Sequence, residues 1–161
     1  MNEKLPQIQE QDTKPKRFVE KGPHVIFDNQ TRIFWLKKDS WQDKGKFFNW
    51  HEARDYADNK NMRKIGGFND WRLPTFNDAV TLYDENLENT AKGGAAIHID
   101  PLFPEGAFKF SWLMGDTSTR RPRFEFMDGT TTTADEYSFG AVRLCRKDPV
   151  KRDHTRPPVR R

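Results

Sequence analysis

The pattern of apolar and polar residues predicts a β-hairpin near the start of the chain. Two apolar runs within residues 24–38 flank a polar segment at 28–32, a loop long enough to hold a bulge. Residues 1–22 are polar, interrupted by proline, and show no periodicity. We therefore expect an extended N-terminal arm over 1–22 and a folded domain over 23–147.

Helical periodicity follows in two segments, and each is preceded by a residue that can cap a helix. Asn49 opens the first segment with Glu52 in the capping-box position, and a glycine pair ends it. Thr75 opens the second, over about 76–88, with Asp78 in the same box position. Its predicted buried face consists of Phe76, Ala79, Val80, Tyr83 and Leu87.

The second half of the chain predicts an antiparallel meander. Strand-like runs lie at 108–114, 123–127 and 140–146, and Asp128-Gly129 is typical of a hairpin turn. Residues 39–48 are expected as a loop with apolar anchors. The order of hairpin, two helices and meander predicts an α+β domain, with the helices packed on small twisted antiparallel sheets.

Composition excludes several classes of protein. Mean hydropathy is −0.98, and no apolar run approaches the roughly 20 residues that a membrane span needs. Aromatic residues make up 13% of the chain, far more than in a disordered sequence. A single cysteine, Cys145, cannot form an internal disulfide. The N-terminus lacks the apolar stretch of a signal peptide, so we expect a cytoplasmic protein and leave an exported compartment open.

The net charge of +4 comes from the C-terminal tail. Residues 146–161 hold seven Lys or Arg and two Asp, whereas residues 24–145 hold 16 basic and 18 acidic residues. A nucleic-acid-binding domain carries its basic face on the folded body, so nucleic acid is not the expected partner. We expect other protein subunits to contact the two arms. In the tail, 148–161, the candidate contacts are Arg152, Arg156, Arg160 and Arg161.

Several short motifs together resemble one bacterial domain family. They are Asn49-Trp50-His51-Glu52-Ala53, Gly67-Phe68-Asn69-Asp70-Trp71-Arg72-Leu73-Pro74-Thr75, Ile99-Asp100-Pro101-Leu102-Phe103-Pro104 and Val142-Arg143-Leu144-Cys145-Arg146. Over residues 24–147 the chain is similar to the C-terminal domain of collagen-like bacterial adhesins. The resemblance implies a fold similar to C-type lectins and formylglycine-generating enzymes, with the chain ends in neighbouring strands. It also implies a binding module for glycans or proteins, with no catalytic residues to carry over.

A structural role is expected for most of the motif residues. Trp71 suits a core beneath a sharp connector, and Arg72 can bind loop carbonyls, Asp70 or Asp100. A ligand platform formed by Trp71 and Arg72 is the alternative. The full structural set is Trp50, Asp70, Trp71, Arg72, Leu73, Pro74, Asp128, Gly129 and Arg143.

The residue pattern favours no catalytic or metal site. The formylglycine-generating reaction uses a cysteine pair, and Cys145 stands alone. No two of the four histidines have the spacing of zinc ligands on a helix. Calcium would be the lectin-like cofactor, but no EF-hand-like carboxylate spacing occurs. We therefore expect no cofactor, with calcium as an unsupported alternative.

Three functions remain in order of preference. The first is a non-catalytic interaction protein, an accessory or scaffolding subunit of a larger complex. The second is binding of polyanionic glycans or another carbohydrate through the loop face, where planar guanidinium groups pair with sulfate or carboxylate. An enzyme of the formylglycine-generating type is the least favoured. The candidate glycan-binding residues are Arg120, Arg121, Arg123, Trp41 and Trp112.

Overall fold

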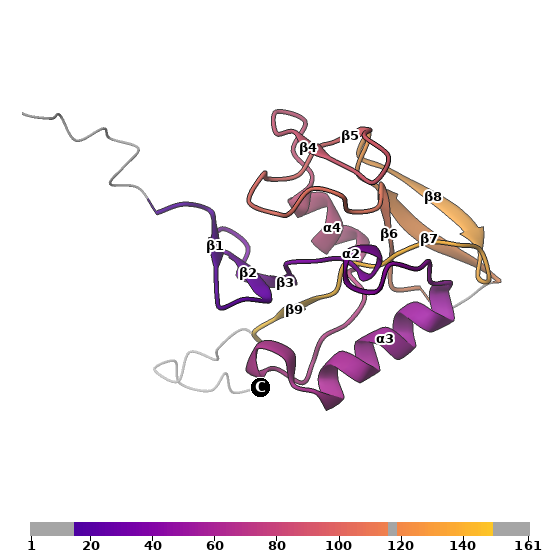
Figure 1. Cartoon of the computed structure of the whole chain (residues 1–161), viewed down its shortest axis with the longest axis horizontal. Coiled ribbons are helices and arrows are strands. Elements are labelled where there is room, and N and C mark those ends of the chain that lie inside the picture. Colours follow the sequence, from indigo (N-terminus) through magenta and orange to yellow (C-terminus); the bar gives the residue numbers. More distant parts are fainter. Residues whose placement is uncertain (1–14, 116–118, 150–161) are drawn as a thin grey trace, which may run out of the picture.

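A four-stranded antiparallel sheet joins the early hairpin to the last strand of the domain (Figure 1). The computed structural model of the chain describes residues 15–115 and 119–149. The strands are β1 (Phe18–Glu20), β2 (Val25–Asp28), β3 (Ile33–Leu36) and β9 (Cys145–Lys147), in the order β1-β2-β3-β9. Because β3 pairs with β9, segments more than one hundred residues apart in sequence lie side by side.

A second sheet lies at the other end of the domain (Figure 1). It contains β6 (Phe110–Trp112), β7 (Arg120–Glu125) and β8 (Thr130–Asp135), with β7 in the centre. Asp128 and Gly129 form the turn between β7 and β8 as predicted, and the Gly129 φ of 77° suits glycine. A two-stranded ribbon, β4 (Asn89–Thr90) with β5 (Ala96–Ile97), completes the β structure.

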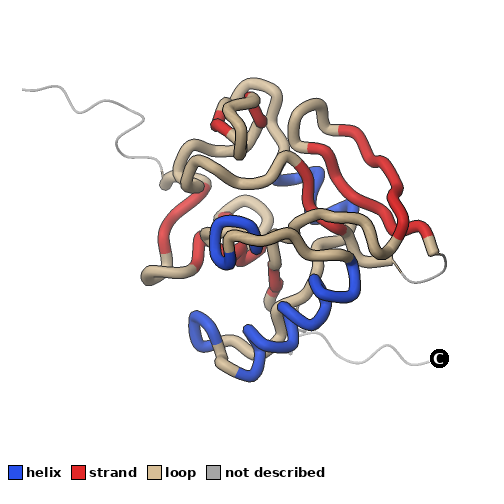
Figure 2. Tube along the Cα trace, turned by 45° about the vertical axis from the view of Figure 1, so that its right-hand side comes forward, coloured by secondary structure: helices blue, strands red, loops and turns tan. Residues whose placement is uncertain are grey.

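Three α-helices accompany the sheets within the described residues. They are α2 (Ser40–Lys44), α3 (Trp50–Met62) and α4 (Phe76–Leu82), and a short 3₁₀ turn, η1 (Ile65–Gly67), follows α3. The predicted capping boxes are present at both long helices: Asn49 with Glu52, and Thr75 with Asp78. The α+β class is therefore confirmed. Figure 2 shows α3 along one side of the domain, with long loops between the other elements.

Three local expectations were wrong. Residues 18–20 of the expected N-terminal arm form β1, because their backbone pairs with β2. The expected loop at 39–48 contains α2, because Asp39 and Gln42 form a capping box and Gly45 ends the helix with a φ of 67°. Helix α4 stops at Leu82. Ala79 is buried as predicted, but Phe76 and Val80 are exposed because α4 buries Asp78 and Leu82 in their place.

Aromatic side chains fill two adjoining cores. One core, which contains Trp35, Phe103 and Phe124, lies between the first sheet and α4. The other contains Trp50, Trp71 and Trp112 and joins α3 to β6. Burying such large rings stabilises a domain whose overall composition is polar.

Two arginine–aspartate clamps hold the edge strands of the first sheet. Arg17 precedes β1 and donates from Nε and Nη2 to both carboxylate oxygens of Asp28, at 3.0 and 2.9 Å. Arg146 in β9 holds Asp70 in the same way, at 2.7 and 3.1 Å. Bidentate pairs of this kind are strong and geometrically specific. We refer to Arg17–Asp28 and Arg146–Asp70 as the two clamps.

Candidate functional site

The arginines of β7 do not form one anion-binding cluster. Alternation along the strand places Arg121 and Arg123 on one face and Arg120 on the other. Arg120 donates to the main-chain oxygen of Thr133 at 2.9 Å. On the other face, Arg123 donates to Thr132 Oγ1 at 2.8 Å, and its guanidinium lies 4.3 Å from the Phe110 ring centroid. Each of these two side chains thus makes contacts within its own sheet.

The Arg121 side chain is occupied by contacts within the domain. Its guanidinium lies 3.9 Å from the ring centroid of Trp50 and donates to the Gly115 carbonyl oxygen at 2.5 Å. A longer contact of 3.5 Å joins it to Glu136, and its side chain is only 12% exposed. A cation packed on an indole face in a dry site is stabilising, so Arg121 fastens β7 to α3.

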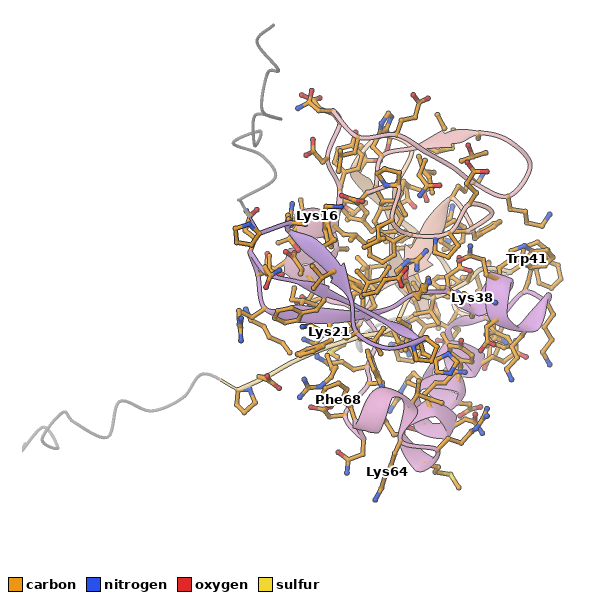
Figure 3. All side chains as sticks on the ribbon, turned by 60° about the vertical axis from the view of Figure 1, so that its left-hand side comes forward. Lys16, Lys21, Lys38, Trp41, Lys64 and Phe68 are labelled. Atoms are coloured by element: carbon orange, nitrogen blue, oxygen red, sulfur yellow. The ribbon has the colours of Figure 1, made fainter. Side chains whose placement is uncertain are left out.

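The two candidate tryptophans have opposite environments. Trp112 is completely buried, and its indole N–H donates to the Phe48 carbonyl oxygen at 2.9 Å. It was predicted as a glycan contact, and that role is excluded for the folded domain because the ring has no exposed surface. Trp41 lies on α2 at the edge of the fold (Figure 3).

Trp41 belongs to an exposed group of aromatic rings. It stacks on Phe47 with a centroid distance of 4.8 Å, and Phe47 lies 5.9 Å from Phe139. The side chain of Phe139 is 78% exposed. The Lys92 ammonium lies 4.6 Å from the Trp41 ring centroid. We call Trp41, Phe47, Phe139 and Lys92 the aromatic surface.

Sequence reasoning missed most of the aromatic surface. Phe47 and Phe139 lie in separate loops, and the bridge between Phe48 and Gly140 brings those loops together. Neither loop has a periodicity that distinguishes an exposed ring from a buried one. An aromatic residue within a polar segment, as Phe139 is, was the available signal.

A groove separates α3 from the connector that leads to α4. Its volume is about 610 Å³. The groove is lined by Trp50, Arg54, Ala57, Asp58, Trp71, Arg72, Leu73, Thr75, Met114 and Gly115. It therefore passes directly along the Asp70–Pro74 motif. Sites for small molecules commonly have volumes of about 300–1,000 Å³.

The motif residues hold the connector at one wall of this groove. The Trp71 indole N–H donates to the Ile65 carbonyl oxygen at 2.9 Å, and Asn61 accepts the Trp71 backbone N–H at 2.6 Å. Asp70 belongs to one clamp, and Leu73 and Pro74 are buried. Trp50 donates from its indole to Leu113 O at 2.9 Å.

Arg72 binds Asp78, a partner that the sequence did not indicate. Its Nη1 donates to Asp78 Oδ2 at 2.7 Å and lies 3.4 Å from the sulfur of Cys145. Burial raises the pKa of Asp78, but hydrogen bonds from Arg72 and the Thr75 N–H outweigh burial and leave that pKa below its usual value. Backbone bonds between Arg72 and Cys145, at 2.9 and 3.0 Å, attach the connector to β9.

Arg143 is the buried arginine of the late motif. Its Nη1 donates to the carbonyl oxygens of Leu36 and Lys37 at 3.0 and 2.7 Å. Burial lowers the pKa of this guanidinium and raises the pKa of the Asp39 carboxyl. Asp39 accepts the Phe108 backbone N–H at 2.7 Å, in addition to capping α2.

The other groups considered for chemistry have structural surroundings. Burial raises the pKa of the Cys145 thiol, which disfavours the reactive thiolate. The Asp128 carboxylate accepts hydrogen bonds from the Thr130 N–H and hydroxyl within the hairpin turn. Among residues 15–115 and 119–149, no group of three or more His, Cys, Asp or Glu side chains is close enough to hold a metal ion.

The expected partner contacts of the tail fall outside the described residues. Arg152, Arg156, Arg160 and Arg161 all follow residue 149. In the described part of the chain, no helix has the length and apolar character needed to cross a bilayer.

One family of protein domains matches most of the chain. Residues 24–146 match the Lcl C-terminal domain, and the chain belongs to that family. The match includes α3, α4, the connector between them and the first two residues of β9. No curated protein matches the chain.

Proposed function

We propose that this chain is a non-catalytic interaction module, an accessory or assembly subunit that docks on a protein partner through the aromatic surface. The observation that carries the proposal is the exposure of Phe139, 78%, beside the stacked pair Trp41 and Phe47. Exposed apolar patches mark interaction sites, and aromatic residues are enriched at the centres of protein interfaces. Such rings are also frequent among the residues that dominate binding energy.

The lysines around the aromatic rings indicate the chemistry of the partner. Three exposed lysines surround the aromatic surface. Lys44 ends α2, Lys46 follows it in the chain, and Lys92 lies over Trp41. A complementary segment would place an apolar side chain on Phe47 and Phe139 and acidic residues near the lysines. Complementary charge of this kind increases the association rate and fixes orientation.

The proposal includes a C-type-lectin-like fold and kinship with the binding domains of collagen-like adhesins. The pairing of β3 with β9, which places the first and last strands of the domain in one sheet, supports the lectin-like organisation. The internal contacts of Arg72, Arg121 and Arg143 support a scaffold role for the polar residues. In the proposed assembly, the expected arms, 1–22 and 148–161, add contacts with the partner subunits.

Quantitative co-purification of the full chain tests the proposal. The double variant Phe47→Ser with Phe139→Ser is expected to recover its partner proteins at least tenfold less than the wild type. The control is Met62→Ser, which alters another exposed apolar side chain, 83% exposed on α3. Equal recovery by the double variant, or the absence of any partner of the wild type, would contradict the proposal. Deletion of residues 1–14 and 150–161 measures the contribution of the two arms. Combined with the double variant, it is expected to reduce the recovery of partner proteins further.

Polyanionic glycan is a second candidate ligand for the same surface. The observation that favours it is the Lys92 ammonium, 4.6 Å from the Trp41 ring and 5.8 Å from the Phe47 ring. An aromatic face accepts the apolar face of a sugar, and the ammonium attracts a sulfate or carboxylate on it. A glycan array with Lys92→Ala and Trp41→Ala tests this candidate. Binding that both substitutions leave unchanged would exclude this surface.

A further inference from the structure

The groove between α3 and the connector has the composition of a ligand site that the proposed function does not involve. Trp50, Ala57, Trp71 and Leu73 are buried residues and supply an apolar lining. Arg54, Asp58 and Arg72 supply the charges. An open groove of about 610 Å³, with a mostly apolar lining and a few polar groups, has the size and composition of many small-molecule sites.

Arg72 has hydrogen-bonding capacity that the described part of the chain does not fill. All of its side-chain contacts, to Leu73 O, Asp78 Oδ2 and Cys145 Sγ, are made by Nη1. A guanidinium has five N–H donors, of which Nε and Nη2 carry three. Within residues 15–115 and 119–149, that edge of Arg72 has no hydrogen-bond acceptor, and the side chain is 33% exposed.

Two other arginines show what this edge binds elsewhere in the protein. Arg17 and Arg146 each present Nε and Nη2 to the two oxygens of an aspartate, at 2.7 to 3.1 Å. Among residues 15–115 and 119–149, no carboxylate accepts a hydrogen bond from the same two donors of Arg72. The vacant edge therefore suits a carboxylate that comes from outside.

The other charged residues of the groove affect which ligand charge it favours. Arg54 is exposed on α3 and lies over the Trp50 ring at 5.3 Å, where it adds positive potential. Asp58 is exposed one helical turn further on and opposes an anion. The Asp78 carboxylate is already bound to Nη1 of Arg72 at 2.7 Å.

We propose that the groove binds a small organic acid, a carboxylate joined to a ring-sized apolar group. The carboxylate lies on the Nε–Nη2 edge of Arg72, and the apolar group lies against Trp50 and Leu73. Charge complementarity at Arg72 and Arg54 selects the acid over its uncharged analogues. The site is independent of the aromatic surface, so the two proposals succeed or fail separately.

Titration of the isotope-labelled full chain with phenylacetate, followed by NMR, tests the site. We expect saturable shifts at groove residues, including the indole N–H signals of Trp50 and Trp71, with an affinity of about 1 mM. Phenylacetamide lacks the charge and is expected to bind at least tenfold more weakly. Acetate lacks the ring and is expected to give no saturable shift. Equal binding of the amide, shifts centred elsewhere, or no saturation with phenylacetate would overturn the proposal.

Two substitutions on α3 form a matched pair that leaves Arg72 intact. Asp58→Asn removes the opposing charge and is expected to tighten phenylacetate binding about two- to threefold, the effect of one solvent-screened charge nearby. Asp55→Asn makes the same chemical change at another exposed position of α3, outside the groove, and is expected to have no effect. Equal affinities of these two variants would contradict the charge argument.

Arg72→Met tests the carboxylate contact directly, and about a tenfold loss of phenylacetate affinity is expected. Because Arg72 also holds Asp78, the folded state of this variant is verified from its NMR spectrum. An unchanged affinity in folded Arg72→Met would overturn the assignment of the carboxylate to this side chain. If Arg72→Met does not fold, the pair Asp58→Asn and Asp55→Asn decides the question.

Discussion

Arg17 and Asp28 are joined by two parallel hydrogen bonds of 3.0 and 2.9 Å, and the Asp28 carboxylate is completely buried. Asp28 also accepts the Thr31 hydroxyl at 2.7 Å and the Gln30 N–H at 2.9 Å. Arg17 extends the contact to the Thr81 carbonyl oxygen at 2.7 Å. One carboxylate thereby organises the turn after β2, the start of β1 and the end of α4.

Replacement of Asp28 by asparagine is expected to lower the free energy of unfolding by about 3 kcal/mol. The reason is that the Arg17 guanidinium loses its charged partner in a largely buried site. Urea unfolding of the variant measures the loss. The control is Glu20→Gln, which alters an exposed pair with Lys37 and is expected to cost less than about 0.5 kcal/mol. A similar cost for both variants would show that the clamp contributes little.

Stability is expected to fall as the pH is lowered below about 5. Burial raises the pKa values of Asp28, Asp43 and Asp78, but hydrogen bonds from their partners outweigh burial and hold all three pKa values below the usual value of an aspartate. The unfolded chain therefore binds more protons than the folded chain in acid, and each group's stabilisation is lost as pH falls through its folded pKa.

Urea unfolding at a series of pH values between 7 and 3 measures this dependence. Asp28→Asn removes one of the three groups and is expected to give a shallower decline than the wild type. Asp39 has the opposite effect on stability. Burial raises its pKa, so protonation of Asp39 as the pH falls favours the folded state. An identical decline in the wild type and Asp28→Asn would contradict the assignment of Asp28.

Gly140→Ala is expected to destabilise the domain by about 2–3 kcal/mol. A Cβ at this position would lie 2.5 Å from Trp112 Nε1 and 2.9 Å from a ring atom of Phe110, in a core that cannot move freely. Tryptophan fluorescence during unfolding measures the change. Gly93→Ala is the comparison, since its Cβ meets nothing within 4 Å and only its φ of 88° is strained. A cost no greater than that of Gly93→Ala would contradict the predicted clash.

The thiol of Cys145 is expected to resist modification in the folded protein. The residue is fully buried beside Asp78, and burial raises the pKa of its thiol. A chromogenic disulfide reagent should react at least about a hundredfold more slowly with the native chain than with the chain in guanidinium. Since the chain has one cysteine, the signal has a single source. Rapid labelling under native conditions would show that β9 opens readily.

Local rules predicted much of the fold. The capping boxes at Asn49 and Thr75 located the starts of α3 and α4, and Asp128-Gly129 located the turn of the β7–β8 hairpin. These signals lie within a few residues of each other, so they can be recognised without tertiary information. Helix α2 carried the same signal at Asp39 and Gln42, but its five residues have too short an apolar pattern to stand out.

Tertiary contacts decided what the sequence left open. Trp41 and Trp112 have the same chemistry, yet Trp41 lies at the edge of the fold, whereas Trp112 is buried against Phe48 and Gly140. Whether Arg72 binds Asp70, Asp78 or Asp100 depends on the orientation of α4 against the connector. The aromatic surface depends on two loops that meet only in the folded chain. Periodicity within one element carries no information on these distances.

The two clamps have a mechanical consequence. β1 and β9 are the opposite edges of one sheet, and tension on the chain from both sides would pull them outward. Arg17 lies just before β1 and pairs with Asp28 in β2, whereas Arg146 lies within β9 and pairs with Asp70 in the connector, so each pair resists the separation of its edge strand. We expect the domain to withstand stretching better than its three-residue edge strands suggest, and single-molecule pulling of Asp28→Asn should give a lower rupture force.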